Sequence, residues 1–296
     1  MQAARTKYAQ AIATLKSACA QTFFLCFTLL IAGMCPRLVN GDDALVRMKF
    51  ADSKGNSRDV EGKIVVTAED GGVLLFGRDG RLWNVTPDRM ESREESGRNF
   101  APMAADELGA ELLKELGGSF TLTRTKHYLI VSAADREYAE WCGSVLEALF
   151  KSFFDFWRTK KLELHEPEFP LVAVILPNRT SFAEFALKDA GEQGRSSHGY
   201  YSVPTNRMVH YDLTADLPKT GGRNRSDISA RLEASAYNLA TVVHEATHQI
   251  AFNSGLHTRL ADNPLWLTEG LAMFCETPDL KSRSGWKTIG TLNKKR

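Results

Sequence analysis

Residues 226–247 constrain the fold most, because they contain neither Gly nor Pro and carry apolar side chains at helical spacing. This pattern predicts one long, amphipathic, partly buried helix. Ser226 or Asp227 suits its N-cap, since either side-chain oxygen can accept a hydrogen bond from an unpaired backbone N–H. Gly255 suits its C-terminal stop. The apolar positions that carry the pattern are Ile228, Leu232, Leu239, Val242, Val243 and Ala246.

Two histidines lie late in this predicted helix, in the order His244, Glu245, Ala246, Thr247, His248. Positions i and i+4 share one helix face, so His244 and His248 can direct both imidazoles at one point. Two imidazoles in that geometry suit a zinc ion, and Glu245 can reach a zinc-bound water as general base. The motif therefore predicts a zinc site with His244 and His248 as metal ligands and Glu245 as catalytic residue.

A second helix is predicted over residues 263–274. A catalytic zinc takes three protein ligands and keeps one position open, so this helix can supply the third. Glu269 is our candidate for that ligand. His257 and Asp262, on the loop between the two helices, are the alternatives.

The HExxH motif, followed by a helix that contains Glu269 and Gly270, resembles the gluzincin-type zinc metallopeptidases. The wider pattern is similar to a bacterial secreted family of unknown function within the peptidase-MA-like group. That wider resemblance covers roughly residues 105–290 and includes residues 125–131 and 199–201.

The resemblance implies that His244, His248 and Glu269 bind zinc and that Glu245 is the general base. It implies an α+β fold in which a zincin-like mixed sheet packs beside the HExxH active-site helix. It also implies a zinc metallopeptidase that hydrolyses peptide bonds of a peptide or protein substrate with a zinc-activated water. Glu276 lies seven residues after Glu269 on nearly the same helix face. It is our candidate for a carboxylate that orients a ligand histidine.

A catalytically inactive zinc-binding or partner-binding module of the cell envelope is the alternative function. The intact Glu245 favours the enzyme, whereas the few residues after Glu276 favour the binding module. We expect the C-terminal subdomain of the zinc domain to be short or missing. A metal-free structural protein is a third reading, and it predicts no bound zinc.

Three segments are expected along the chain. Residues 1–41 read as a signal peptide or N-terminal anchor, because basic residues precede the short apolar run at 23–32. Residues 42–97 read as a small β module with strands at 44–50, 63–67, 73–76 and 81–85, followed by a charged linker at 91–97. Residues 98–296 form the zincin-like domain.

Within the third segment, helices are expected at 104–116, 136–157 and 181–187, and strands at 127–132 and 171–176. The near-continuous apolar run 171–176 predicts a central strand. Residues 199–211 predict a hairpin, which is our candidate for the strand that binds an extended peptide. Its Tyr200, Tyr201, His210 and Tyr211 are candidates for stabilising an oxyanion, with packing as the more common role of such residues.

The composition limits the kinds of binding partner that the sequence predicts. A net charge of +1, with 25% charged residues, does not predict a strong field for nucleic acid or for a membrane surface. We therefore expect no nucleic-acid partner, and membrane contact only through an uncleaved N-terminal segment. The predicted signal implies export to the periplasm, the extracellular space or the envelope. Cys142 and Cys275 remain in the mature chain, and either a disulfide or two buried thiols fits their apolar surroundings.

Overall fold

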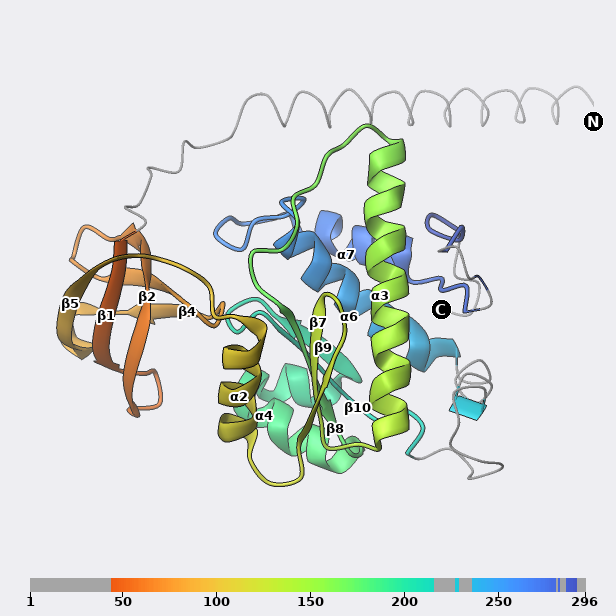
Figure 1. The fold of residues 1–296 in the computed structure, drawn as a ribbon, viewed down its shortest axis with the longest axis horizontal. Coiled ribbons are helices and arrows are strands. Elements are labelled where there is room, and N and C mark those ends of the chain that lie inside the picture. The colour runs from red at the N-terminus through yellow and green to blue at the C-terminus, as the bar shows by residue number, and fades with distance from the viewer. Residues whose placement is uncertain (1–43, 216–226, 229–235, 281, 283–285, 292–296) are drawn as a thin grey trace, which may run out of the picture. The chain divides into compact units, whose positions relative to one another are not determined.

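The computed structural model describes residues 44–215, 227–228, 236–280, 282 and 286–291 (Figure 1). It holds two five-stranded sheets and several helices, so the α+β class is confirmed. The predicted export signal at residues 1–41 lies outside the described residues. Within the described ranges, no helix combines the length and apolar content that a membrane crossing requires.

The first sheet has the strand order β4-β3-β2-β1-β5, with every neighbouring pair antiparallel. One face is apolar because alternate residues of each strand point the same way. That face forms a small core around Met48, Phe50 and Leu75. The four strands predicted in this region are confirmed. The strands are β1 (Ala44–Ala51), β2 (Ser57–Thr67), β3 (Val73–Gly77), β4 (Leu82–Val85) and β5 (Met90–Asn99), with a short 3-10 turn, η1 (Pro87–Arg89), before β5.

The prediction of a linker at residues 91–97 is wrong, because these residues belong to β5. The strand pairs antiparallel with β1 at the edge of the sheet, with Glu94 opposite Arg47. Most of its side chains are exposed. An edge strand that buries little can be highly charged, and opposite charges across the pair stabilise it. The charged composition of residues 91–97 therefore led to the wrong prediction of a linker.

The second sheet is mixed and has the order β6-β7-β8-β10-β9. Its three inner strands run parallel, and β6 and β9 pair antiparallel at the two edges. All six residues of β8 are buried, which confirms the predicted central strand. The predicted hairpin is also confirmed as β9 and β10, whereas β6 escaped prediction. The strands are β6 (Thr121–Arg124), β7 (Tyr128–Ser132), β8 (Leu171–Leu176), β9 (Gly199–Ser202) and β10 (Arg207–Tyr211).

The helices of this part pack on the second sheet and on one another. The motif helix α6 ends at Asn253, and Gly255 follows at φ +82°, the left-handed conformation that favours Gly, as predicted. Of the two proposed N-caps, Ser226 lies outside the residues that the structure describes, and Asp227 is itself helical. The helix expected at 181–187 is longer, with a break at Gly191. The helices are α2 (Ala105–Leu116), α3 (Arg136–Thr159), α4 (Arg179–Ser196), α6 (Ala236–Asn253) and α7 (Leu265–Cys275).

A buried polar network joins α6 to the β9–β10 hairpin. The Gln249 Nε2 donates to the carbonyls of Val172 and Asn206, at 2.9 and 3.0 Å. The Asn253 Nδ2 and the Tyr201 hydroxyl both donate to Asn206 Oδ1, at 2.7 and 2.8 Å. Asn206 has φ 59°, which Asn tolerates better than most residues. Because buried polar groups are costly to leave unpaired, this network fixes the hairpin against the motif helix.

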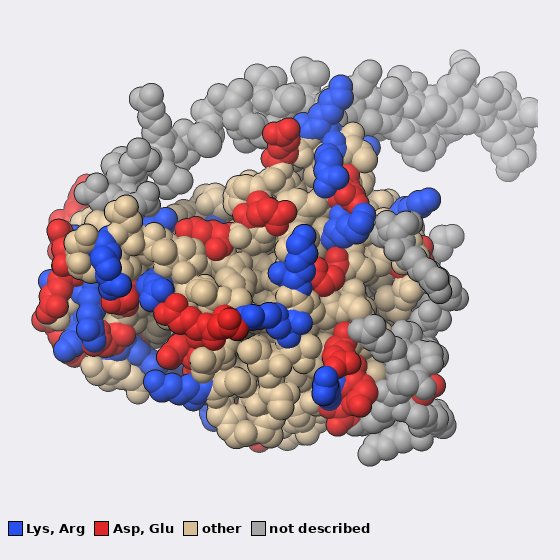
Figure 2. Space-filling view, viewed as in Figure 1, with Lys and Arg blue, Asp and Glu red and all other residues tan. Residues whose placement is uncertain are grey.

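The first sheet is tied to the hairpin and to α2 by arginines. Arg81 and Arg207 both pair with the Glu115 carboxylate, at 2.5 and 2.8 Å. Arg259 donates to the carbonyls of Gly80 and Val203, at 2.8 and 2.9 Å. These contacts hold the turn of the hairpin from both the first sheet and the loop after α6. Figure 2 shows that acidic and basic side chains are interspersed over the face in view.

Cys142 and Cys275 are free, buried thiols, so the disulfide alternative does not apply. Burial raises the pKa of the Cys275 thiol to about 12. Such a thiol stays protonated and behaves as a small apolar side chain.

Candidate metal centre

The two helices predicted to share a metal site do meet there. His244 and His248 come from α6 and Glu269 from α7, and their ligand atoms all lie within 4.8 Å of one another. Glu269 is the predicted third ligand. The alternatives, His257 and Asp262, do not belong to this group, which is the one cluster of possible metal ligands found among the described residues.

The spacing within the cluster suits a small cation. The Nε2 atoms of His244 and His248 lie 3.2 and 3.4 Å from the two carboxylate oxygens of Glu269. Donor atoms of a tetrahedral zinc site with bonds of about 2.0–2.1 Å stand about 3.3–3.4 Å apart, and both of these separations are close to that value. The histidine side chains are 6% and 11% exposed, whereas that of Glu269 is 46% exposed. The cluster is thus buried on the α6 side and open on the α7 side.

The buried Glu276 carboxylate orients one histidine. Its Oε2 lies 3.3 Å from Nδ1 of His244, on the side of the ring away from Glu269. A proton on Nδ1 then faces Glu276 and the lone pair of Nε2 faces the cluster. The proposed role of Glu276 as an orienting carboxylate therefore agrees with the geometry.

His248 is held neutral by its surroundings. Burial, and then the nearby charges of His244 and His257, lower its pKa to about 3. A neutral imidazole offers the lone pair that a metal ion requires. The donor set is thus two imidazoles and one carboxylate, which is a common set for catalytic zinc.

Replacing Glu276 with Gln is expected to weaken zinc binding by about 10- to 100-fold, because the histidine loses its charged orienting partner. Zinc titration against a chromophoric chelator measures this change. Glu147→Gln is the matched control, since Glu147 makes the same contact with Nδ1 of His127 outside the cluster. Equal affinities in the two variants would show that Glu276 does not orient a ligand.

Glu245 lies in the wall of a cavity that also contains the three clustered side chains. This cavity has a volume of about 620 Å³ and is lined by the two histidines, Glu245, Glu269 and the residues of β9. The backbone N–H of Tyr201 donates to Glu245 Oε2 at 2.9 Å. A main-chain donor carries no residue signature, so this contact could not be predicted from the sequence.

The four candidates for stabilising an oxyanion have other contacts. The hydroxyls of Tyr200 and Tyr201 donate to Asp189 and Asn206, although both residues line the cavity. His210 is fully buried, with Nδ1 3.0 Å from the carbonyl of Tyr211. Tyr211 is buried and packs against Phe182. His210 and Tyr211 therefore contribute to packing.

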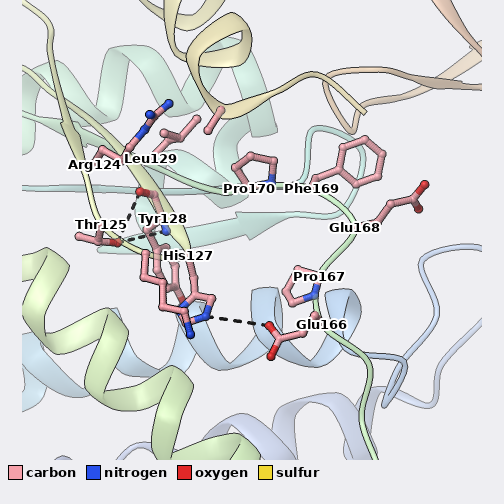
Figure 3. A pocket seen from close by; sticks show the side chains of 12 residues that line it. Arg124, Thr125, His127, Tyr128, Leu129, Glu166, Pro167, Glu168, Phe169 and Pro170 are labelled. Carbon is pink, nitrogen blue, oxygen red and sulfur yellow. Dashed lines mark hydrogen bonds and ion pairs between the residues drawn. The ribbon is translucent and has the colours of Figure 1, made fainter. Parts of the chain in front are cut away.

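A separate cavity of about 460 Å³ surrounds His127 (Figure 3). Nδ1 of His127 lies 2.6 Å from a carboxylate oxygen of Glu147, and Nε2 lies 3.9 Å from Glu166. The imidazole stacks on Phe150, with ring centroids 3.8 Å apart. Packing and ion pairing therefore explain the position of the His127 side chain, and no ligand has to be assumed.

Comparison with known proteins adds one match. The family model described as a protein of unknown function (DUF1570) matches residues 238–296, the part of the chain that holds α7 and nearly all of α6. No curated protein and no solved structure matches the chain. The two motif helices are therefore the region of this protein that is similar to a known family.

Proposed function

We propose that this protein is a zinc metallopeptidase of the gluzincin type with a zincin-like fold. The observation that carries the proposal is the convergence of His244, His248 and Glu269, with Glu245 in the wall of the same cavity. With the predicted signal, we expect it to act in the periplasm, the extracellular space or the envelope.

Zinc would be held by the three clustered side chains. When bound, zinc acts as a Lewis acid that lowers the pKa of a coordinated water and polarises a carbonyl oxygen. Glu245 would serve as general base, taking a proton and passing it to the leaving amine. The Tyr201 amide fixes this carboxylate in the cavity wall through Oε2. Glu276 would keep His244 in the ligand orientation.

The edge strand β9 is suited to hold the substrate backbone. Among the described strands it pairs with β10 alone, and its other edge faces the cavity, where the Tyr201 amide points away from the sheet. Backbone groups of an antiparallel edge strand alternate in direction, so Gly199 offers its N–H and C=O on the same side as Tyr201. An extended peptide can pair with this edge and pass over the metal ligands.

Metal analysis and hydrolysis together test the proposal. We expect about one zinc per chain, and zinc-dependent cleavage within a mixed peptide library. Removing the metal with a chelator should abolish cleavage, and added zinc should restore it. A folded protein that binds no zinc when zinc is supplied would refute the proposal.

The partner-binding alternative has one observation in its favour. Leu265, Trp266 and Met273 leave an apolar, exposed face on α7, the helix that carries Glu269. Exposed apolar patches commonly mark interaction sites. Bound zinc without cleavage of any peptide in the library would favour this alternative over the enzyme.

A further inference from the structure

A third cavity, of about 300 Å³, lies between the first sheet and the C-terminal end of α6. We call it the Phe252 pocket. Phe76 and Leu82 line it from the first sheet, Phe169 from the loop before β8, and Leu260 from the loop after α6.

The walls of the Phe252 pocket are mainly apolar. The rings of Phe76 and Phe169 meet edge to face at 4.9 Å, and the Arg259 guanidinium lies 5.4 Å from the centre of the Phe76 ring. That guanidinium already donates to the carbonyls of Gly80 and Val203. Its hydrogen bonds are thus used to hold the pocket together, and the rings provide the surface for an occupant.

The pocket adjoins the metal cavity, because Phe252 lines both. Strand β9 and helix α6 run side by side in the same direction. A Cβ on Gly199 would lie 3.6 Å from Thr241, the Tyr201 amide reaches Glu245, and the Tyr201 ring stacks on Phe252 at 5.7 Å. A peptide paired with β9 would therefore pass the metal ligands and then reach Phe252.

The distance from the metal ligands to Phe252 corresponds to a small number of residues in an extended substrate. Phe252 lies six residues after the midpoint between His244 and His248, which is about 9 Å along the helix axis. An extended peptide advances about 3.3 Å per residue. Two or three residues of substrate thus separate the metal from the Phe252 pocket.

We propose that the Phe252 pocket binds a large apolar or aromatic side chain two or three residues from the scissile bond. This inference rests on the proposed peptidase function and narrows its substrate to polypeptides with such a residue. The walls come from the first sheet as well as from α6, so the β module takes part in substrate selection.

Leu260→Trp tests the pocket, because a larger ring at its rim would fill it. Val66→Trp is the control, since Leu260 and Val66 are 38% and 46% exposed and Val66 lines neither cavity. We expect the wild type to cleave library peptides with Phe, Tyr, Leu or Met enriched at one position. For a matched peptide pair with Phe or Ala there, kcat/KM should favour Phe by about 10- to 100-fold.

Leu260→Trp should bring that ratio close to parity without changing bound zinc, whereas Val66→Trp should keep it. Cleavage without apolar enrichment, or equal ratios in the two variants, would overturn the pocket and leave the peptidase intact. If no peptide is cleaved, the peptidase proposal fails. A binding measurement then tests separately whether the Phe252 pocket accepts an apolar side chain. Fluorescein-labelled peptides with Phe should then bind the full chain more tightly than those with Ala, and Leu260→Trp should remove the difference. Equal affinities of the wild type for the Phe and Ala peptides would refute the proposed role of the pocket.

Discussion

Replacing Glu245 with Gln is expected to lower peptide hydrolysis by about 10²- to 10⁴-fold, while bound zinc stays at the wild-type level. Gln has nearly the same shape as Glu, and its side-chain oxygen can still accept the Tyr201 N–H that Glu245 accepts at 2.9 Å. It cannot take up a proton, however, so the variant removes the general base and keeps the wall of the cavity.

Single-turnover rates on a cleaved library peptide, measured beside elemental zinc analysis, separate the outcomes. Glu111→Gln is the matched control, because Glu111 is an exposed carboxylate on α2 that lines neither the metal cavity nor the Phe252 pocket. Undiminished hydrolysis by zinc-loaded Glu245→Gln would exclude Glu245 as the base. Loss of zinc in this variant would instead mean that Glu245 maintains the cluster.

The parts of the site that follow from local spacing were predictable. His244 and His248 are four residues apart on one helix, and Glu276 follows Glu269 at a spacing that keeps both on one side of α7. Helical geometry alone predicts that each pair shares a face. The contact between Glu276 and His244 at 3.3 Å agrees with that prediction.

The parts that depend on long-range packing were not predictable. The Tyr201 amide reaches Glu245 because Asn206 and Asn253 fix the hairpin against α6. The sequence offers no means of deriving that register. The Phe252 pocket combines residues as distant as Phe76 and Leu260, which only the tertiary fold brings together. Two of the four edge strands were missed for another reason: β5 is charged and β6 has four residues, so neither has a clear apolar pattern.

His248→Ala is expected to weaken zinc binding by more than about 100-fold, beyond the effect of losing an orienting partner. The substitution removes one of the three atoms that would bind the ion, and the two that remain cannot complete the set. Competition with a chromophoric chelator measures the affinity. His257→Ala is the control, because His257 is also buried, with a pKa lowered by burial, but lies outside the cluster.

Glu269→Ala and Asp262→Ala apply the same comparison to the third ligand. Glu269 lies within 3.4 Å of both ligand histidines, so its loss should weaken zinc binding as strongly as that of His248. Asp262 is exposed on the preceding loop, and its variant should bind zinc as the wild type does. Circular dichroism of each variant separates ligand loss from unfolding. If His257→Ala or Asp262→Ala released the metal while Glu269→Ala kept it, the third ligand would come from the loop, and the open side of the centre would face α7.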